Sequence, residues 1–357
     1  MSSALFATAS VAEDRIWVIN NGDGDVSVVA SSPPRTVTRL KFDAQPIDLA
    51  VSKTDHLAFV ALEGANGPLI AYDAVSAQAV WRAEAGVALQ EIDLAAGPDG
   101  GVALAAIGER SIILFDIATG RRIAQSQLPG KAKMIAANGP RRRAAIAGVG
   151  GSRRIGVFDL STIDGARETA SPSGGMSFGG GLTRQAAAPR RGLVIGQIDG
   201  LNGFEVGDVL EPSDVRRVKH DKSLGLPSLI KALGFLNTDG FSRCHGVAVN
   251  KDESEVWATC GKNLNVHTLE TPGYPPAAYM RLPSRGLWVT FSSDGARAYV
   301  SMPDENAILI VDAASKQFIE TILVGEDPVR AVAVTVEKPS TDPLAPSDES
   351  RESKDAQ

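Results

Sequence analysis

The 357-residue sequence has little of several features that would assign a function directly. It contains two cysteines and four histidines, and aromatic residues make up 5% of it. No apolar run approaches the ~20 residues that a membrane-spanning helix needs, so we expect no membrane association. The glycine-rich stretch SGGMSFGGG has no following lysine, which excludes a phosphate-binding loop of the common type. The sequence by itself names neither a substrate nor a reaction.

Basic charge is also in deficit, and the formal net charge is -6. Residues 337–357 hold six acidic and three basic residues, so this end accounts for half of the net charge. The remaining body is close to neutral, and we therefore expect no nucleic-acid partner. The same end is rich in serine, proline and charge, which predicts a disordered acidic tail after a single domain spanning residues 1–336.

The N-terminal sequence MSSALFATASVAEDRIWVINN lacks a basic segment followed by an apolar block, the pattern of a secretory signal peptide. We expect a cytoplasmic protein, or a periplasmic or secreted one if an export signal was trimmed. In a reducing cytoplasm, two buried thiols are the default state of the cysteines, and a disulfide is the alternative.

A repeat of 43 residues is the strongest pattern present. The residues that close short apolar strands at this interval are Ala30, Asp73, Asp116 and Asp159. The counterparts later in the sequence are Glu205, Leu269 and Asp312, at intervals of 46, 64 and 43 residues. A period of 40 to 45 residues built from short strands is typical of a β-propeller, in which each repeat is one four-stranded blade. The 64-residue step before Leu269 indicates an insertion.

The last repeat, residues 286–324, carries a family resemblance. Its segment AYVSMPDENAILIVD resembles the YVTN-type repeat of bacterial YncE-like propellers, where YVTN precedes a hairpin and a valine-rich strand that ends in Asp. The segment HGVAVNKDESEVWATCGKNLNVHTLE is similar to the same repeat. The match is good in the last two blades and looser in the first four, and arginine-rich turns depart from it in blades four and five. The resemblance implies a propeller whose top face binds a small ligand or a partner protein.

We therefore predict an all-β protein, a seven-bladed β-propeller of four-stranded antiparallel blades. The inner-strand sequence PVRAVAV at 328–334 predicts that the C-terminal strand closes the ring; a competing closure would use ALFATASVAEDRIWV as the inner strand. The insertion, residues 221–243, falls between blades five and six on the top rim, where the inner strands begin. Its segment SLIKALGFL has apolar residues at helical spacing and predicts a short helix, either a lid or a cover for an apolar gap.

The top rim near blade six concentrates the rarer chemistry. Cys244 and His245 begin the predicted inner strand, and Cys260 ends the second strand opposite Cys244. The strand register decides whether the two cysteines can form a disulfide. His245 is the candidate acid, base or ligand, because imidazole titrates near pH 7; the alternative is a structural histidine. A zinc site of Cys244, His245 and Cys260 lacks a clear fourth ligand, so we expect no metal and no cofactor.

Corresponding positions in the other blades supply further candidates, namely Asp48, Asp93, Lys133, Arg184, Trp288 and Arg330. If these side chains point inward, the channel mouth suits a polar or anionic small molecule with a flat apolar part. The alternative is that the charges pair with one another around a water-filled channel. We take Asp48, Asp93, Lys133, Cys244 and Trp288 as ligand-binding candidates.

Two functions follow from these candidates. The first is a monomeric binding propeller with a small ligand or protein partner at the top face. The second is a propeller enzyme of lactonase, hydrolase, lyase or isomerase type, with His245 as acid or base and Arg184 or Arg330 holding an anion.

Overall fold

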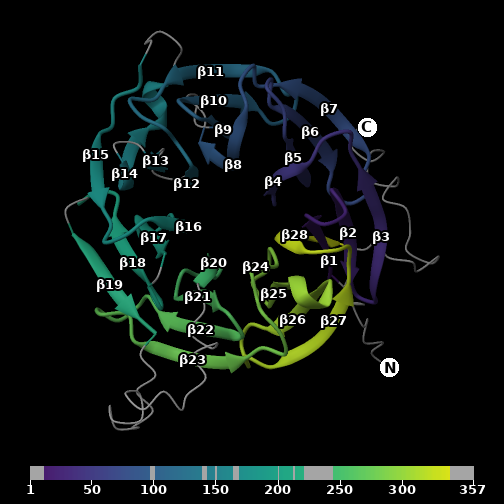
Figure 1. The fold of residues 1–357 in the computed structure, drawn as a ribbon. Helices are drawn as coiled ribbons and strands as arrows, with labels where there is room; N and C mark the ends of the chain where they lie inside the picture. Colours follow the sequence, from purple (N-terminus) through teal and green to yellow (C-terminus); the bar gives the residue numbers. More distant parts are fainter. Residues whose placement is uncertain are drawn as a thin grey trace, which may run out of the picture.

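The structure is a computed structural model that describes residues 12–96, 101–138, 143–148, 151–163, 169–199, 201–211, 214–220 and 244–337. These residues form seven four-stranded antiparallel sheets, which surround a central axis as blades (Figure 1). The predicted seven-bladed, all-β propeller is therefore confirmed. The predicted helical insertion at 221–243 and the tail beyond residue 337 lie outside the described residues.

Each blade runs from an inner strand at the axis to an outer strand at the periphery (Figure 1). Blade one contains β28 (Pro328–Glu337), β1 (Ala12–Asn20), β2 (Asp25–Ser31) and β3 (Pro34–Lys41). Blade two contains β4 (Pro46–Ser52), β5 (Leu57–Leu62), β6 (Pro68–Asp73) and β7 (Ala79–Glu84). Blade three contains β8 (Leu89–Ala96), β9 (Val102–Gly108), β10 (Ser111–Asp116) and β11 (Arg122–Gln127). Blade four contains β12 (Met134–Asn138), β13 (Arg143–Gly148), β14 (Gly151–Asp159) and β15 (Gly174–Ser177).

The remaining blades follow the same order. Blade five contains β16 (Leu182–Ala188), β17 (Leu193–Ile198), β18 (Gly203–Asp208) and β19 (Val215–Lys219). Blade six contains β20 (Cys244–Val249), β21 (Glu255–Cys260), β22 (Asn263–Thr268) and β23 (Pro276–Arg281). Blade seven contains β24 (Trp288–Phe291), β25 (Arg297–Met302), β26 (Ala307–Asp312) and β27 (Phe318–Leu323). The described residues also include two short 3₁₀ helices, η2 (Leu160–Thr162) and η4 (Pro303–Glu305). In this part of the chain no helix is long and apolar enough to span a membrane.

The hydrophobic core lies between neighbouring blades. Trp17 of blade one packs with Leu49 and Tyr72 of blade two in one buried cluster, and similar clusters join other neighbours. A middle strand such as β10 is buried along most of its length because blades cover both of its faces. An outer strand such as β7 alternates between exposed and half-buried residues, since one face meets solvent.

The 43-residue repeat arises from one kind of turn after the third strand. In five of the seven blades this turn begins with an aspartate whose Oδ1 accepts a backbone N–H two or three residues later; these aspartates are Asp73, Asp116, Asp159, Asp208 and Asp312. The fifth blade corrects the prediction from sequence. Glu205 lies in the middle of β18, and Asp208 ends the strand and caps the turn. A carboxylate at the strand end satisfies backbone donors that the sheet leaves unpaired.

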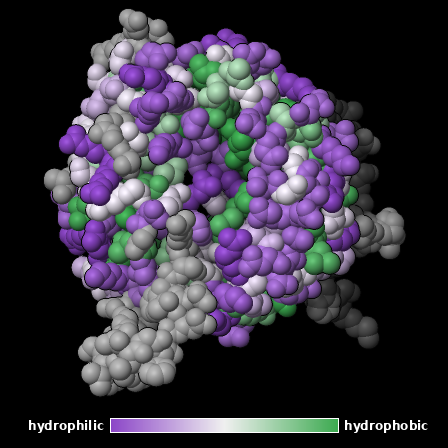
Figure 2. Space-filling model, in the orientation of Figure 1, coloured by the Kyte–Doolittle hydropathy of each residue, from purple (hydrophilic) through white to green (hydrophobic). Residues whose placement is uncertain are grey.

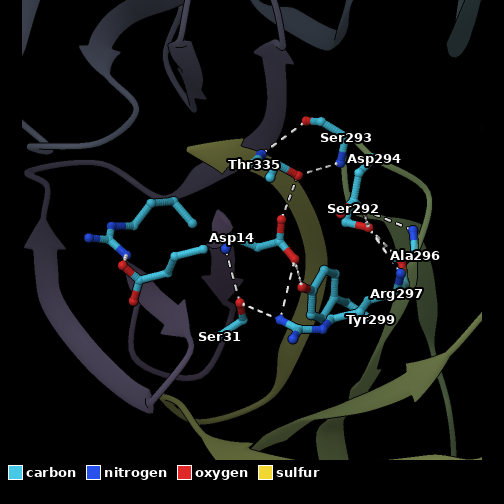
Figure 3. Close-up of polar contacts among 11 residues, drawn as sticks. Asp14, Ser31, Ser292, Ser293, Asp294, Ala296, Arg297, Tyr299 and Thr335 are labelled. Atoms are coloured by element: carbon cyan, nitrogen blue, oxygen red, sulfur yellow. Dashed lines mark hydrogen bonds and ion pairs between the residues drawn. The ribbon is translucent and has the colours of Figure 1, made fainter. Parts of the chain in front are cut away.

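The first blade joins the two ends of the described chain. β28 pairs antiparallel with β1, from Ala12 opposite Glu337 to Asn20 opposite Pro328. The buried carboxylate of Asp14 connects this blade to the seventh (Figure 3). It accepts hydrogen bonds from the hydroxyls of Thr335 on β28, at 2.6 Å, and Tyr299 on β25.

Candidate functional site

The inner strands place a layer of charged side chains in the central channel. The third residue of four inner strands is charged, and these residues are Asp48, Glu91, Arg184 and Arg330. In β4, β8 and β16 the strand register shifts just before or at this residue, and such a bulge re-aims a side chain. Hydrophilic residues surround the hollow at the centre of the ring (Figure 2).

The carboxylates of this region join consecutive blades. Asp48 Oδ2 accepts the backbone N–H of Ile92 at 2.8 Å, and Glu91 Oε2 accepts that of Ile135 at 2.7 Å. Asp93, two residues further along β8, accepts the backbone N–H of Ala137 at 2.8 Å. Each bond therefore spans 44 residues and ties one inner strand to the next. These carboxylates consequently have a structural role besides any contact with a ligand.

Arg330 is held by two of these carboxylates. Its Nε lies 2.5 Å from Asp48 Oδ1, and its Nη1 lies 2.9 Å from Glu91 Oε1. The side chain of Arg330 is 12% exposed and that of Asp48 is 1% exposed. A buried charge without a partner is costly, so this pair stabilises the mouth as a unit.

Arg184 is held more loosely. Its Nη1 is 3.4 Å from Glu91 Oε1, near the limit for a hydrogen bond, and its side chain is 33% exposed. Its Cζ lies 4.6 Å from the ring centroid of Trp288, and the Cζ of Arg330 lies 4.5 Å from the same centroid. Two guanidinium groups thus share one indole and one carboxylate. Burial, followed by the charge of Arg330, lowers the pKa of Arg184, so a further anion would be favourable beside it.

The position of Trp288 depends on a glycine in the neighbouring blade. A Cβ on Gly246 would lie 2.8 Å from the Cα of Trp288 and 2.6 Å from the carbonyl oxygen of Leu287. Thr259 bridges the same contact, because its Oγ1 accepts from Gly246 N–H and its hydroxyl reaches the Leu287 carbonyl at 3.1 Å. Ser301 Oγ accepts the backbone N–H of Trp288 at 3.0 Å. The indole is therefore set by the packing of blades six and seven.

A cavity of about 270 Å³ lies within the channel. Its wall includes Glu91 and Arg330 from the charged layer, and Asp93, Gln185 and Trp288 from neighbouring positions. Arg184 is not among the lining residues, but it contacts two of them, Glu91 and Trp288. The Oε1 of Gln185 is buried and has no hydrogen-bond partner among the described residues. The wall therefore offers a cationic edge, a flat ring and two acceptor groups.

Two carboxyl groups of the channel, those of Asp48 and Asp93, have raised pKa values. Burial raises the pKa of Asp48 to about 7, with Arg330 opposing the shift and Glu91 adding to it. Burial also raises the pKa of Asp93 to about 6, although backbone N–H groups of Ala137 and Leu94 oppose the shift. Asp93 forms no ion pair among the described residues, so its charge is the least compensated of the layer.

The structure brings together four of the residues singled out from the sequence. Asp48, Arg184, Trp288 and Arg330 form one contact network, and Asp93 lines the adjoining cavity. Lys133 is exposed and precedes β12. Their roles in binding remain predictions.

Sequence reasoning missed Glu91, which contacts both arginines. The signal was present, because adding the 43-residue period to Asp48 gives Glu91 and not Asp93.

The candidate residues of blade six, Cys244, His245 and Cys260, do not line the channel cavity. Cys244 pairs directly with Cys260 across β20 and β21, and the two form a disulfide. The default expectation of two thiols is therefore not what the structure has, since the register places the side chains opposite each other. His245 is half-buried and is not among the residues that line the channel cavity.

Two other histidines form a pair that the sequence did not suggest. His220 Nδ1 lies 2.9 Å from His267 Nε2, and both residues are buried. Burial lowers the pKa of His220 to about 3, with His267 contributing, and burial also lowers the pKa of His267. Residues 220 and 267 belong to different blades, so only the packing of blades five and six reveals the pair.

A GxSxG string, residues 175–179, also escaped the sequence reasoning. Ser177 ends the outer strand β15 and is exposed, and no helix follows it. The nucleophile elbow of hydrolases needs a strand-to-helix turn, so this string is not one.

No protein-family model matches this sequence, and no curated protein matches it by sequence. Solved structures do resemble the fold. Apo AztD from Citrobacter koseri has a TM-score of 0.64 and 12% identity, covering 91% of this chain and 98% of its own. The periplasmic gluconolactonase PpgL of Pseudomonas aeruginosa has a TM-score of 0.65 and 11% identity, covering 90% and 99%. The dihydro-heme d1 dehydrogenase NirN has a TM-score of 0.58 and 14% identity, covering 89% and 74%. At these identities the likeness shows the propeller fold, and membership of the YncE-like family stays a prediction.

Proposed function

We propose that this protein is a binding propeller that takes up a small hydroxylated anion at the mouth of its central channel. The observation that carries the proposal is the sharing of Trp288 and Glu91 by two arginines, at the edge of a cavity of about 270 Å³. A site for a small ligand needs a concave wall with a few convergent polar groups, and this wall has them.

Arg184 is the residue that we expect to bind the anion. Arg330 already contacts two carboxylates, whereas Arg184 makes one long contact, to Glu91, among the described residues. A guanidinium offers paired donors that match a carboxylate or phosphate. A ligand anion would replace the contact with Glu91, which Arg330 and the N–H of Ile135 would continue to hold.

Trp288, Asp93 and Gln185 of the cavity wall indicate which chemical groups the ligand has besides the anion. The indole supplies a flat apolar surface next to the anion, while Asp93 and the Oε1 of Gln185 accept hydrogen bonds. The Oε1 of Gln185 would be satisfied by a hydroxyl or amine group of a ligand. Asp93 already accepts the backbone N–H groups of Leu94 and Ala137, and its carboxylate has lone pairs left for one more donor. The fit is best for a small hydroxycarboxylate that places its carboxylate at Arg184 and its hydroxyls in the cavity.

Calorimetric titration tests this proposal. Short-chain hydroxycarboxylates should bind to the wild-type protein, their neutral amides should bind at least about tenfold more weakly, and Arg184→Gln should remove the difference. Arg216→Gln is the matched control, because Arg216 is a half-exposed arginine on the outer strand β19 that pairs with Asp214. Equal affinity for acids and amides, or undiminished binding in Arg184→Gln, would exclude the arginine site.

Catalysis at the same mouth is the second candidate. His245 would act as acid or base, with Arg184 or Arg330 holding the anion. Binding remains the first candidate because Arg184 and Arg330 contact Glu91 and Trp288 of the cavity wall, which bears on an anion site and not on an acid or base. Turnover of lactones that is lost in His245→Ala would support the enzyme, and turnover unchanged in that variant would exclude His245 from the chemistry.

A further inference from the structure

A second group of ligating atoms lies where blade five meets blade six. A ring nitrogen of His220 and the Sγ atoms of Cys244 and Cys260 all lie within 4.8 Å of one another. All three residues are buried. The zinc site considered from sequence paired the cysteines with His245, but the structure brings His220 to them from the end of blade five.

The hydrogen bonds of the histidine pair determine which nitrogen of His220 is available. His267 Nδ1 lies 2.8 Å from the carbonyl oxygen of Tyr274, which can only accept, so this nitrogen carries a proton. His267 Nε2 is then an acceptor, and His220 Nδ1–H donates to it at 2.9 Å. The Nε2 of His220 is left with a lone pair, and it has no hydrogen-bond partner among the described residues.

This arrangement is the one that metal-binding histidines commonly have. A ligating imidazole usually donates its other N–H to a fixed acceptor, which sets its tautomer and orientation. Here His267 and the Tyr274 carbonyl provide such a chain. Without a metal, a buried imidazole lone pair that accepts no hydrogen bond would lower the stability of the fold, because its desolvation is not compensated.

We propose that reduction of the Cys244–Cys260 disulfide creates a zinc site with His220 Nε2 and the two thiolates as protein ligands. A dithiol reductant supplies two electrons and two protons, so that one disulfide becomes two thiols while the reductant becomes a disulfide. Zinc then displaces the two thiol protons and forms two Zn–S bonds and one Zn–N bond. A disulfide oxidant reverses the sequence: it takes two electrons from the two thiolates, re-forms the Cys244–Cys260 bond and is itself reduced to two thiols with two protons from solvent. The ion is released in this step, which makes the site a redox-controlled store for zinc.

Two features give the site an open side. Three protein ligands leave the fourth tetrahedral position for water or an exogenous ligand. Asn202 Oδ1 lies 4.0 Å from Cys244 Sγ, close enough to hold such a water. A cavity of about 250 Å³ is lined by His220, Asn265, His267 and residues 276–279, and it offers a route for the ion.

Cobalt titration of the full chain tests the proposal. After reduction with a phosphine and removal of the reductant under inert gas, Co²⁺ should bind at one equivalent and produce thiolate-to-cobalt absorption and intense tetrahedral bands. The untreated, oxidised protein should produce neither. His220→Asn should lose the tetrahedral bands, and His267→Gln should weaken binding about 10- to 100-fold. His56→Asn is the control, because His56 is exposed in a turn, and it should bind as the wild type does.

X-ray absorption on the reduced, zinc-loaded wild type keeps the test independent of whether the variants fold. Two sulfur neighbours at about 2.3 Å and a nitrogen neighbour at about 2.0–2.1 Å are expected. Oxidation of this sample should release one equivalent of zinc to a chromogenic chelator. Unchanged cobalt spectra in folded His220→Asn, or no stoichiometric metal in the reduced wild type, would overturn the proposal.

Discussion

The carboxylate of Asp48 accepts the backbone N–H of Ile92 at 2.8 Å, although the two residues lie in different blades and 44 positions apart. The same carboxylate is 2.5 Å from the guanidinium of Arg330 in the last strand. Three blades of the ring therefore meet at one side chain. This side chain therefore ties the inner strands of three blades together at the channel mouth.

Asp48→Ala should destabilise the protein by about 3–5 kcal/mol, because it leaves a buried guanidinium and a buried N–H without their partner. Urea unfolding at pH 8 measures the loss. Asp304→Ala is the control, since Asp304 forms an exposed ion pair with Arg285, and its loss should stay below about 1 kcal/mol. Equal effects of the two substitutions would show that Asp48 does not join the blades.

The pH dependence of stability should report on Asp93. Its pKa is raised to about 6 from 3.8, so between these values the folded state binds more protons than the unfolded state. The stability contributed by the protonated form is present below about pH 4 and is lost as the pH rises through 6. Asp93→Asn should remove the contribution of Asp93, which is at most about 3 kcal/mol and is reduced because the residue is only half-buried. The contribution of Asp48, whose pKa is also raised, should remain in the variant.

Urea unfolding of both proteins at several pH values between 4 and 8 measures this difference. Asp312→Asn, at an exposed turn with a lowered pKa, is the control and should leave the slope between pH 5 and 7 unchanged. Parallel curves for the wild type and Asp93→Asn would contradict the assignment.

Tyr299→Phe should cost about 1–2 kcal/mol, because the tyrosine hydroxyl donates to the buried Asp14 carboxylate at the junction of blades seven and one (Figure 3). Thr335→Val should cost a similar amount, and a double-mutant cycle should show coupling, since both hydroxyls bind one carboxylate. Thermal unfolding measures all three variants. Tyr279→Phe, on the outer strand β23, should have little effect, and additive single losses would argue against a shared network.

The unfolded protein should contain no free thiols before reduction and two after it, as counted with a chromogenic disulfide. Cys244 and Cys260 are 16 residues apart, and a loop of this size contributes about 3 kcal/mol when closed by a disulfide. Reduction should therefore lower the unfolding temperature. Two free thiols in the untreated protein would contradict the disulfide.

Gly246→Ala should destabilise the protein by about 1–3 kcal/mol and weaken ligand binding, because a Cβ would push against the backbone of Trp288. Gly181→Ala is the control, since a Cβ there meets no atom within 4 Å. Calorimetry with the best hydroxycarboxylate and urea unfolding check both effects. If Gly246→Ala is destabilised but binds the ligand with wild-type affinity, the indole of Trp288 does not contribute to the binding site.

Much of the architecture could be predicted from the sequence because residues close together in the sequence determine the strands and turns of each blade. An aspartate caps the turn after the third strand in five of the seven blades, as Asp73, Asp116 and Asp312 illustrate. At blade five the pattern predicts the strand end at Glu205, whereas Asp208 ends the strand and caps the turn. An acidic residue near the expected position does not by itself identify the end of the strand. The end is marked by the acidic residue that accepts hydrogen bonds from the backbone of the turn, here Asp208.

The sequence alone determined the number of blades and four of the residues that meet at the channel mouth, since a periodic chain brings equivalent positions to one ring. Only the tertiary structure showed that Glu91 joins the two arginines and that His220 lies beside Cys244 and Cys260. The physical reason is that a repeat specifies contacts within a blade, where partners are near in sequence. Contacts between blades depend on which side chains the bulges and the packing turn toward the channel or the neighbouring sheet.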